Sequence, residues 1–235
     1  MDPLDDGYAM ALAGALVWTP RSLRSFLDSL GTARSVIEWV ARHDVPPEGV
    51  PALSDQARQR VSAIDDRTAR AAIDELEKSG ARLVRDSDAD YPSSLRDLVD
   101  PPPLLYVKGD IASLGARPIA IVGSRAATTY GRHVAASLAT DLAGFGASIV
   151  SGLARGVDAC AHAAAVAANA PTIAVIGSGL SALYPPYHAL LADEIVAGGG
   201  AVISEFPPRE AARAHHFPMR NRIVAALAAA TIVVE

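Results

Sequence analysis

The 235-residue sequence contains a single cysteine, Cys160, which excludes an intramolecular disulfide and a cysteine-based zinc cluster. Aromatic residues make up 5% and charged residues 20% of the chain, whereas 50% of the residues are hydrophobic. This composition predicts a folded core and excludes a disordered chain or a coiled coil. Neither G-x-x-x-x-G-K-[ST] nor G-x-S-x-G occurs, so a Walker-type ATP site and a hydrolase nucleophile elbow are not expected.

Long uninterrupted hydrophobic runs are also missing. Residues 159–192 lack Asp, Glu, Lys and Arg, but Asn169, Pro171, Pro185 and Pro186 interrupt them. We therefore interpret this stretch as buried helices and a strand rather than as a membrane span. The amino end, MDPLDDGYAM, is acidic where a signal peptide would be basic, which predicts a cytoplasmic protein.

Lysine is nearly absent, since only Lys78 and Lys108 occur, and most positive charges are therefore guanidinium groups. The net charge of −5 is unevenly distributed: residues 1–110 carry 13 basic and 19 acidic side chains, and residues 111–235 carry 8 and 7. Arginine binds phosphate through two parallel hydrogen bonds and stacks on bases. A nucleic-acid partner for the second half is therefore compatible with an acidic chain.

Apolar residues at helical spacing predict short helices in the first part of the chain. Leu23, Phe26, Leu27 and Leu30 form one such run, and Val36, Ile37 and Val40 form the next. A further helix is predicted from Asp66 to Ser79, with Gly80 as its stop. We place a domain boundary near residue 62, which gives a helical domain over residues 1–62 and a second domain over residues 63–235.

From Pro118 onward, short apolar segments alternate with helical ones, which predicts a doubly wound α/β domain with a mostly parallel sheet. The helix after the first strand is predicted to place Val134, Leu138, Leu142 and Phe145 on one face. The expected strands are Ile119–Val122, Ser148–Val150, Thr172–Ile176, Ala201–Ser204 and Thr231–Val234.

Such a sheet binds ligands at the carboxyl ends of its strands, where loop amides and helix amino termini point outward. Arginines gather on the segments that follow the predicted strands, whereas Arg117 and Arg132 fall elsewhere. This edge is predicted to be basic and lined with glycine. The arginines on it are Arg125, Arg155, Arg209, Arg213, Arg220 and Arg222.

Two glycine-containing loops offer anion contacts at this edge. Gly123-Ser124-Arg125 is either an anion site or a structural turn capped by Ser124. The segment 151–158 supplies close backbone approach at Gly152 and a cation at Arg155, for which we favour phosphate contact. Its carboxylate, Asp158, caps the following helix, pairs with an arginine, or serves the site directly.

The segment 215–222 combines rings and cations, a combination that holds single-stranded nucleic acid without reading its sequence. Phe217 is a candidate stacking residue, with a core role as the alternative. His215 and His216 are adjacent and cannot face the same way, which argues against a metal pair. Cys160 and His162 lie in an alanine-rich segment and are interpreted as buried packing residues.

Residues 177–182 match the dinucleotide fingerprint G-x-G-x-x-G/A, and Glu205 ends the next strand as a ribose-binding acid would. That fingerprint requires a helix to continue directly from the glycines. Pro185 and Pro186 would break such a helix, which more plausibly begins at the prolines. A nicotinamide or flavin site is therefore disfavoured, and we expect neither a cofactor nor a metal.

The order and spacing of these motifs resemble the DNA-processing protein A family, also called Smf, over about 145 residues. The segments that carry the resemblance are YPSSL (91–95), DPPPLLYVKG (100–109), IVGSR (121–125), SGLARGVD (151–158), GSGL (177–180), YP (184–185), SE (204–205) and FPMRNRI (217–223). The helical amino-terminal region resembles the family's SAM-like domain more loosely.

The resemblance implies an extended Rossmann-like domain that binds single-stranded DNA and helps to load RecA recombinase in natural transformation, without being an enzyme. A homodimer is also implied. Arg125 takes the place of the family's phosphate-binding arginine, and Phe217 that of its base-stacking aromatic residue. The full set of predicted DNA-binding residues is Gly123, Ser124, Arg125, Gly152, Arg155, Ser178, Gly179, Arg213, His216, Phe217, Arg220, Asn221 and Arg222.

Three departures from the family pattern stand out. Pro186 occupies a position where some relatives carry lysine, and Arg213 is a candidate replacement for a basic residue ahead of the stacking aromatic residue. Family members continue beyond the position of Glu235, so we expect the sequence to be a fragment. Alternative hypotheses are a sensor or hydrolase for a small nucleotide at the same edge, and a scaffold whose amino-terminal helices bind a protein.

Overall fold

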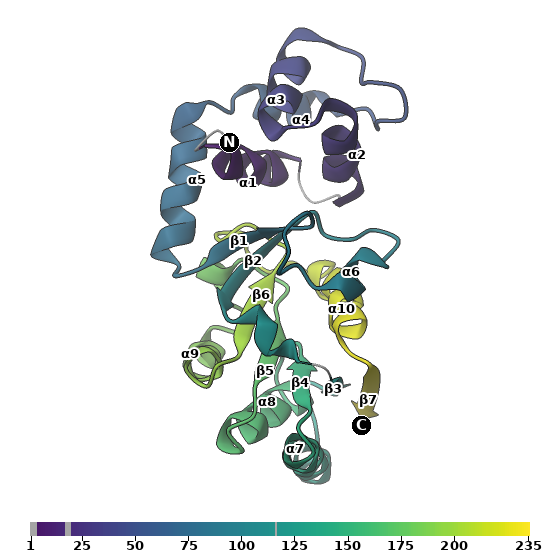
Figure 1. The fold of residues 1–235 in the computed structure, drawn as a ribbon, viewed down its shortest axis with the longest axis vertical. Helices are drawn as coiled ribbons and strands as arrows, with labels where there is room; N and C mark the ends of the chain where they lie inside the picture. Colours follow the sequence, from purple (N-terminus) through teal and green to yellow (C-terminus); the bar gives the residue numbers. More distant parts are fainter. Residues whose placement is uncertain (1–3, 17–19, 116) are drawn as a thin grey trace.

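The computed structural model describes residues 4–16, 20–115 and 117–235. Its first part is helical and lies at one end of an elongated molecule (Figure 1). Side chains at the amino ends of three of these helices accept backbone N–H bonds, as Thr32, Ser54 and Asp65 do. The helices are α1 (Asp5–Ala15), α2 (Pro20–Leu30), α3 (Ala33–Arg42), α4 (Asp55–Ser62) and α5 (Asp66–Lys78).

The helical part has its own core, built from the apolar faces that the sequence predicts. Phe26, Val36 and Val61 are almost completely buried in it. Helix α5 packs against α1 so closely that a Cβ on Gly7 would lie 2.3 Å from the Ala69 carbonyl oxygen. The predicted boundary near residue 62 falls between α4 and α5, and it stays a prediction.

The described residues of the second part form a seven-stranded sheet in the order β1-β2-β6-β5-β4-β3-β7. The five strands from β6 to β7 run parallel, whereas β1 and β2 add antiparallel pairs at one edge. This arrangement confirms the predicted α/β class. The strands are β1 (Arg82–Arg85), β2 (Leu104–Gly109), β3 (Pro118–Gly123), β4 (Ser148–Ser151), β5 (Thr172–Val175), β6 (Ala201–Ser204) and β7 (Ala230–Val234).

Helices cover both faces of this sheet (Figure 1). Ile121 and Ile149 pack against α7 and α8, and their neighbours Ala120 and Val150 point to the face that α6 and α10 cover. The helices are α6 (Ser93–Arg96), α7 (Thr129–Gly144), α8 (Val157–Ala167), α9 (Ala189–Ala197) and α10 (His216–Leu227), with 3-10 turns η1 (Ile111–Leu114), η2 (Leu180–Ala182) and η3 (Pro186–His188). Gly179 is followed only by the three-residue 3-10 turn η2, and the turn that begins at Pro186 leads into α9, so no α-helix continues from Gly177 and Gly179.

The predicted face of α7 is wrong at one residue. Val134, Leu138 and Leu142 pack against the core, but Phe145 is 78% exposed. The helix ends at Gly144, so the helical spacing no longer applies to the following residue. Strands β1 and β2 are not among the predicted strands.

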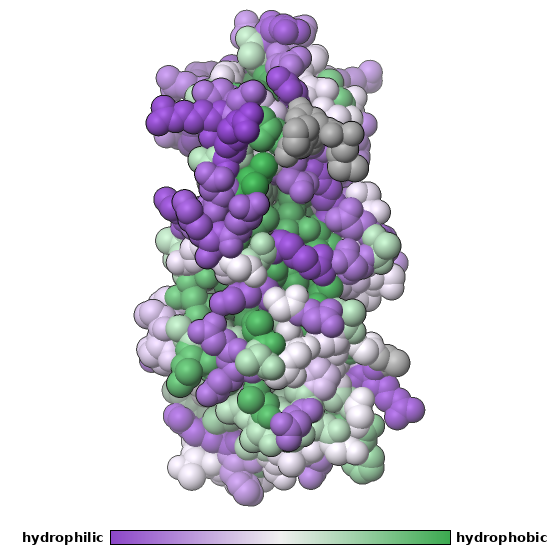
Figure 2. Space-filling model, turned by 60° about the vertical axis from the view of Figure 1, so that its left-hand side comes forward, coloured by the Kyte–Doolittle hydropathy of each residue, from purple (hydrophilic) through white to green (hydrophobic). Residues whose placement is uncertain are grey.

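The face shown in Figure 2 differs along the length of the molecule. Hydrophilic side chains predominate over the helical end, whereas neutral and hydrophobic atoms are more frequent over the α/β end. Within residues 4–16, 20–115 and 117–235, no helix combines the length and apolar composition needed to span a bilayer. The described residues also contain no cluster of three His, Cys, Asp or Glu side chains that could hold a metal.

His162 is completely buried on α8, as the sequence predicts, and it is bonded to β5. Its Nδ1 lies 2.7 Å from Thr172 Oγ1, and that hydroxyl donates to the Ile149 carbonyl at 2.8 Å. Because the hydroxyl has one hydrogen to donate, we assign Nδ1–H as the donor to it. Burial lowers the pKa of His162 to about 3, so the ring is neutral at physiological pH.

This neutral histidine makes stability depend on pH. As the pH falls below about 6.5, the ring takes up a proton in the unfolded chain but not in the folded one. The contribution of the neutral, buried ring to the free energy of unfolding is therefore fully present above about pH 6.5 and is lost as the pH falls toward the folded pKa. Between pH 7 and pH 5, His162→Gln should lose roughly 2 kcal/mol less of its unfolding free energy than the parent chain. Urea titrations at both pH values measure the difference, and exposed His133→Gln is the control. Equal losses of unfolding free energy in the parent and in His162→Gln would refute this pH dependence.

Candidate nucleic-acid interface

The turn after β3 forms the centre of the predicted rim. Ser124 Oγ accepts the N–H of Ala126 at 3.1 Å, so the hydroxyl caps the turn. This is the second of the two roles considered for Gly123-Ser124-Arg125, a structural turn capped by Ser124. The turn leaves Arg125 exposed. In the described part of the chain, no carboxylate oxygen lies within 4.0 Å of the Arg125 or Arg155 guanidinium.

Gly156 brings the loop after β4 against this turn. Its φ is +78°, and a Cβ there would lie 2.2 Å from the carbonyl oxygen of Ser124. The N–H of Val157 donates to the same oxygen at 3.2 Å. A residue with a side chain could not approach so closely, and this contact places Arg155 beside Arg125.

Arg125 stacks over an aromatic ring from the other side of the sheet. Its guanidinium carbon lies 4.6 Å from the centroid of the Phe217 ring, a cation–π distance, and the Tyr184 ring lies 5.8 Å from the same ring at 55°. We call the cleft that these groups form the aromatic slot. It is lined by Arg125, Gly152, Ala154, Arg155, Tyr184, Pro185 and Phe217.

A larger cavity of about 380 Å³ adjoins the slot through Arg125. It lies at the carboxyl end of β3, where the strand order reverses: the chain passes from β3 to β4 on one side, whereas β6 connects through α10 to β7 on the other side. This is the usual ligand position in such sheets. We call it the switch-point cavity. Its lining residues are Val122, Gly123, Arg125, Gly152, Ala154, Asp158, Arg220, Asn221, Val224, Ala225 and Thr231.

Arg220 is the buried cation of this cavity, with only 3% of its surface exposed. One of its nitrogens donates to the carbonyl of Val175, and its Nε has no partner. A Cβ on Gly152 would lie 1.9 Å from Arg220 Nη1, so the glycine makes room for the guanidinium. Burial lowers the pKa of Arg220 to about 10, which leaves it charged at neutral pH.

Asp158 faces this cation from the start of α8. Its carboxylate accepts the N–H groups of Gly152 at 3.1 Å and Ala154 at 3.3 Å. Burial raises its pKa, while Arg220 acts in the opposite direction. The capping role considered for Asp158 is not observed, because the N-cap residue of α8 is Gly156 and no side-chain cap bond is formed there. Asp158 instead orders the loop after β4, and it faces the buried charge of Arg220 as the arginine-pairing alternative expects.

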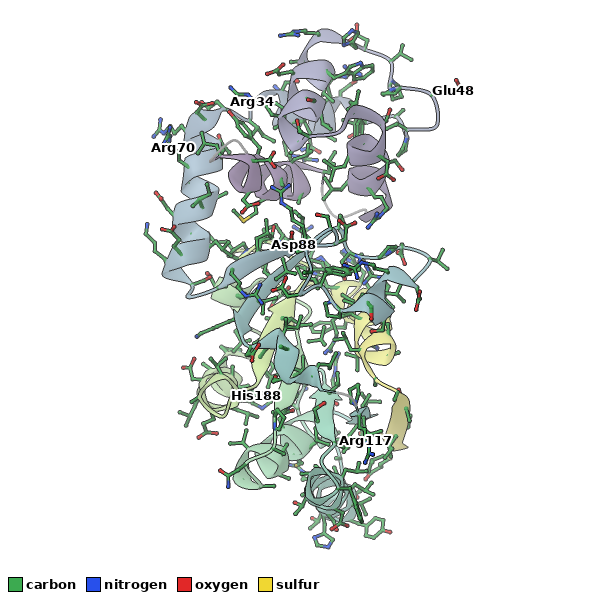
Figure 3. The ribbon with its side chains drawn as sticks, viewed as in Figure 1. Arg34, Glu48, Arg70, Asp88, Arg117 and His188 are labelled. Atoms are coloured by element: carbon green, nitrogen blue, oxygen red, sulfur yellow. The ribbon has the colours of Figure 1, made fainter. Side chains whose placement is uncertain are left out.

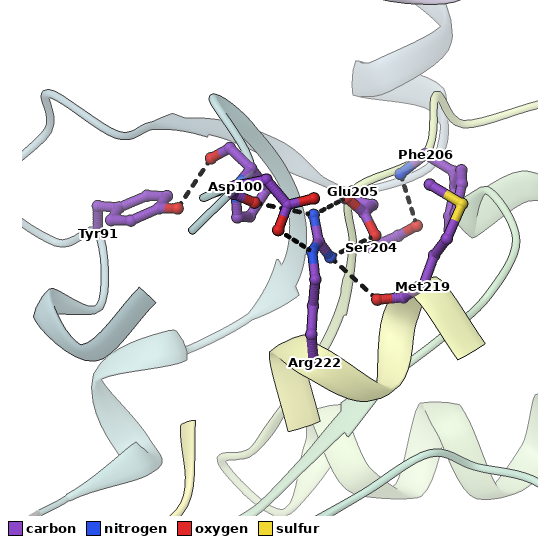
Figure 4. Close-up of polar contacts among 8 residues, drawn as sticks. Tyr91, Asp100, Ser204, Glu205, Phe206, Met219 and Arg222 are labelled. Carbon is purple, nitrogen blue, oxygen red and sulfur yellow. Dashed lines mark hydrogen bonds and ion pairs between the residues drawn. The ribbon is translucent and has the colours of Figure 1, made fainter. Parts of the chain in front are cut away.

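Arg222 points away from the cavity, because residues two apart on a helix lie about 200° apart. It donates to both carboxylate oxygens of Glu205, at 2.8 and 2.7 Å, and its Nε lies 3.3 Å from Asp100 (Figure 4). Glu205 is 1% exposed. The acid that would bind a ribose in the dinucleotide interpretation is therefore occupied by Arg222, which ties α10 to the end of β6.

Four further predicted residues lie outside the two cavities. Ser178 and His216 are buried, and His216 stacks on Phe206 with centroids 4.1 Å apart. Burial lowers the pKa of His216 to about 4, so it is neutral. Gly179 packs against the segment 207–208, where a Cβ would lie 2.0 Å from the Pro207 carbonyl. Arg213 pairs with Glu210 at 3.1 Å.

The structure also brings in residues that the sequence analysis did not assign to the rim. Tyr184 lines the aromatic slot, and Arg132 lines a neighbouring cavity together with Arg125 and Arg155. The sequence feature that could have placed Arg132 at the rim is Thr128. Its hydroxyl accepts the Gly131 N–H and so caps the amino end of α7. The first turn of α7 therefore follows closely on the carboxyl end of β3. Arg209, predicted on the rim, instead forms an ion pair with Glu75 of α5.

Comparison with known proteins identifies the family. The sequence profile of DNA recombination-mediator protein A matches residues 82–235. The chain belongs to the DNA recombination-mediator protein A family. It is 36% identical over 203 residues to Protein Smf of Escherichia coli (85% of this chain, 54% of that protein), and 40% identical over 159 residues to DNA processing protein DprA of Bacillus subtilis (67% and 53%).

Solved structures agree with this family assignment. DprA from Streptococcus pneumoniae superimposes with a TM-score of 0.77 at 31% identity, covering 97% of this chain and 77% of that one. DNA processing protein A from Helicobacter pylori, described for its single-stranded DNA binding mode, gives a TM-score of 0.58 at 33% identity (66% and 70%). The chain spans about half the length of the curated relatives it matches.

The ion pair at Glu205 predicts a stability effect. Arg222→Met leaves a buried carboxylate without its cation and should lower the unfolding free energy by about 3–5 kcal/mol. Adding Glu205→Gln removes the unpaired charge and should recover much of the loss. Urea unfolding measures both, and Arg213→Ala, which removes a partly exposed pair, is the control. A loss in Arg222→Met no larger than in the control would contradict this role.

Proposed function

We propose that this chain binds single-stranded DNA, without catalysis, along the aromatic slot and the switch-point cavity. The observation that carries the proposal is the stack of Arg125 on Phe217, with Arg155 alongside and no carboxylate of the described residues within 4.0 Å of either guanidinium. Cations that are not neutralised within the protein are available to phosphates. Aromatic rings beside them accept bases of any sequence.

The two halves of the interface bind different parts of a nucleotide. Arg125 and Arg155 are exposed and can each hold a phosphate through two parallel hydrogen bonds. Phe217 and Tyr184 offer ring faces for a base, and a base can also stack on the planar guanidinium of Arg125. Arg220 adds a fixed positive charge behind the slot, and exposed Asn221 adds an amide at the cavity mouth.

The family supports a wider proposal about the process served. We infer that the bound strand is protected during natural transformation or recombination in the cytoplasm, and that the protein helps to load RecA recombinase onto it. A homodimer belongs to the same proposal. The relatives' names, DNA processing protein and DNA recombination-mediator protein, support the process, and the Helicobacter pylori protein supports the substrate.

A small-nucleotide sensor or hydrolase is the second candidate, and the switch-point cavity is the observation that favours it. Its volume of about 380 Å³ suits a single nucleotide, and Arg220 and Asp158 lie in its wall. Calorimetric titration with AMP and NAD separates the two functions. Saturable binding with a dissociation constant on the order of micromolar, unchanged by competing oligothymidine, would favour this candidate.

Removing Arg125 tests the main proposal. Arg125→Ala should lower the affinity for oligothymidine about tenfold at moderate salt and reduce the slope of log K against log salt by about 0.7, because one phosphate contact is lost. Fluorescence anisotropy across a salt series measures both. Arg117→Ala is the matched control, since this exposed arginine (labelled in Figure 3) precedes β3 and lies at its opposite end. Equal binding by parent and Arg125→Ala would reject the interface.

A further inference from the structure

A second cleft lies beside the aromatic slot, across the first turns of α7 and α8. It has a volume of about 420 Å³ and shares Arg125 and Arg155 with the slot, so the two clefts are adjacent. We call it the arginine groove. It is lined by Arg125, Ala126, Arg132, Arg155, Gly156, Ala159, Cys160, Tyr187 and His188.

The charge of the arginine groove is of one sign. Three of its lining residues are arginines, and neither aspartate nor glutamate is among them. Arg132 donates through Nε to the Ala127 carbonyl at 3.1 Å, which fixes the side chain while its two terminal nitrogens remain available for an anion. Elsewhere on the rim, Arg209, Arg213 and Arg222 are each paired with a carboxylate. The groove therefore holds available positive charge at this edge.

An exposed aromatic ring stands beside these cations. Tyr187 is 63% exposed, although η3, on which it lies, is fixed to the body of the protein. The anchor is His188, whose Nδ1 lies 2.9 Å from the Leu153 carbonyl and whose ring meets Tyr187 edge-on at 4.7 Å. Tyr187 is thus a solvent-facing ring on a fixed support, a combination that suits base stacking.

We propose that single-stranded DNA leaving the aromatic slot continues through the arginine groove, with phosphates on Arg155 and Arg132 and a base stacked on Tyr187. This inference rests on the proposed function and adds a second segment to the strand's path. It makes binding depend on strand length. A strand of about four nucleotides can contact the slot residues without reaching Tyr187, whereas one of about sixteen extends past them to this ring.

The length dependence is tested with Tyr187→Ala and Arg132→Ala by fluorescence anisotropy. Each variant should bind an oligothymidine of about sixteen nucleotides about tenfold more weakly than the parent, and one of about four nucleotides equally well. Phe145→Ala is the matched control, because it removes another exposed ring at the far end of α7. Parental binding of the longer strand by both variants would overturn the groove, while Phe217→Ala, which changes a residue of the slot and not of the groove, reports separately on the slot.

Cys160 provides a second readout, because it is the sequence's single cysteine and lines the arginine groove; it is partly buried, not fully buried as the sequence predicts. Saturation with the longer oligothymidine should slow its alkylation by N-ethylmaleimide several-fold, and saturation with the shorter one should not. Tyr187→Ala should reduce this protection at a fixed subsaturating concentration of the longer strand. An unchanged alkylation rate under the saturated longer strand would place that strand elsewhere and overturn the inference.

Discussion

Close backbone approach at glycine positions sets the geometry of the whole rim. Gly156 lets the loop after β4 touch the carbonyl of Ser124, and Gly152 leaves the space that Arg220 fills. Gly123 lies so close to β7 that a Cβ would be 1.8 Å from the Val234 carbonyl. These approaches bring the loop after β3, the loop after β4 and helix α10 to one place. Arg125, Arg155 and Arg220 therefore lie close together, because the backbone segments that carry them are in close contact.

The arginines of the second half divide into supporting and available groups. Arg222 and Arg209 join elements of the fold, since the first binds Glu205 and Asp100 and the second binds Glu75 of α5. Arg220 is buried and fixed by the Val175 carbonyl. Arg125 and Arg155 remain exposed at the same edge. An acidic protein can therefore present a local cationic surface, because its carboxylates pair with other arginines.

The fold was predictable from sequence where the signal is local. The ends of the five parallel strands lie within one residue of the predicted ends, because each strand is a short apolar run between glycines and helical segments. The antiparallel strands β1 and β2 were not predicted. Arginine at both ends of β1 leaves only two apolar residues between them, and β2 precedes Pro118, where the regular alternation of apolar and helical segments begins. Phe145 was misplaced because its helix stops one residue earlier.

The site was predictable only in part, for a physical reason. Sequence placed Arg125, Arg155 and Phe217 on the rim through the rule that ligands meet strand ends. It could not separate Arg220 from Arg222, because the difference lies in distant partners, Asp158 for one and Glu205 for the other. Tyr184 and Arg132 were likewise missed, since long-range packing determines what lies beside Arg125.

The fit between Gly152 and Arg220 has a consequence for how this sequence can change over generations. The Arg220 guanidinium fills the space that a side chain at position 152 would need, so the two residues cannot change independently. A side chain at position 152 would displace the Arg220 guanidinium, and loss of the arginine would leave Asp158 without its buried counter-charge. A change at one of these three positions therefore alters the effect of a change at the other two.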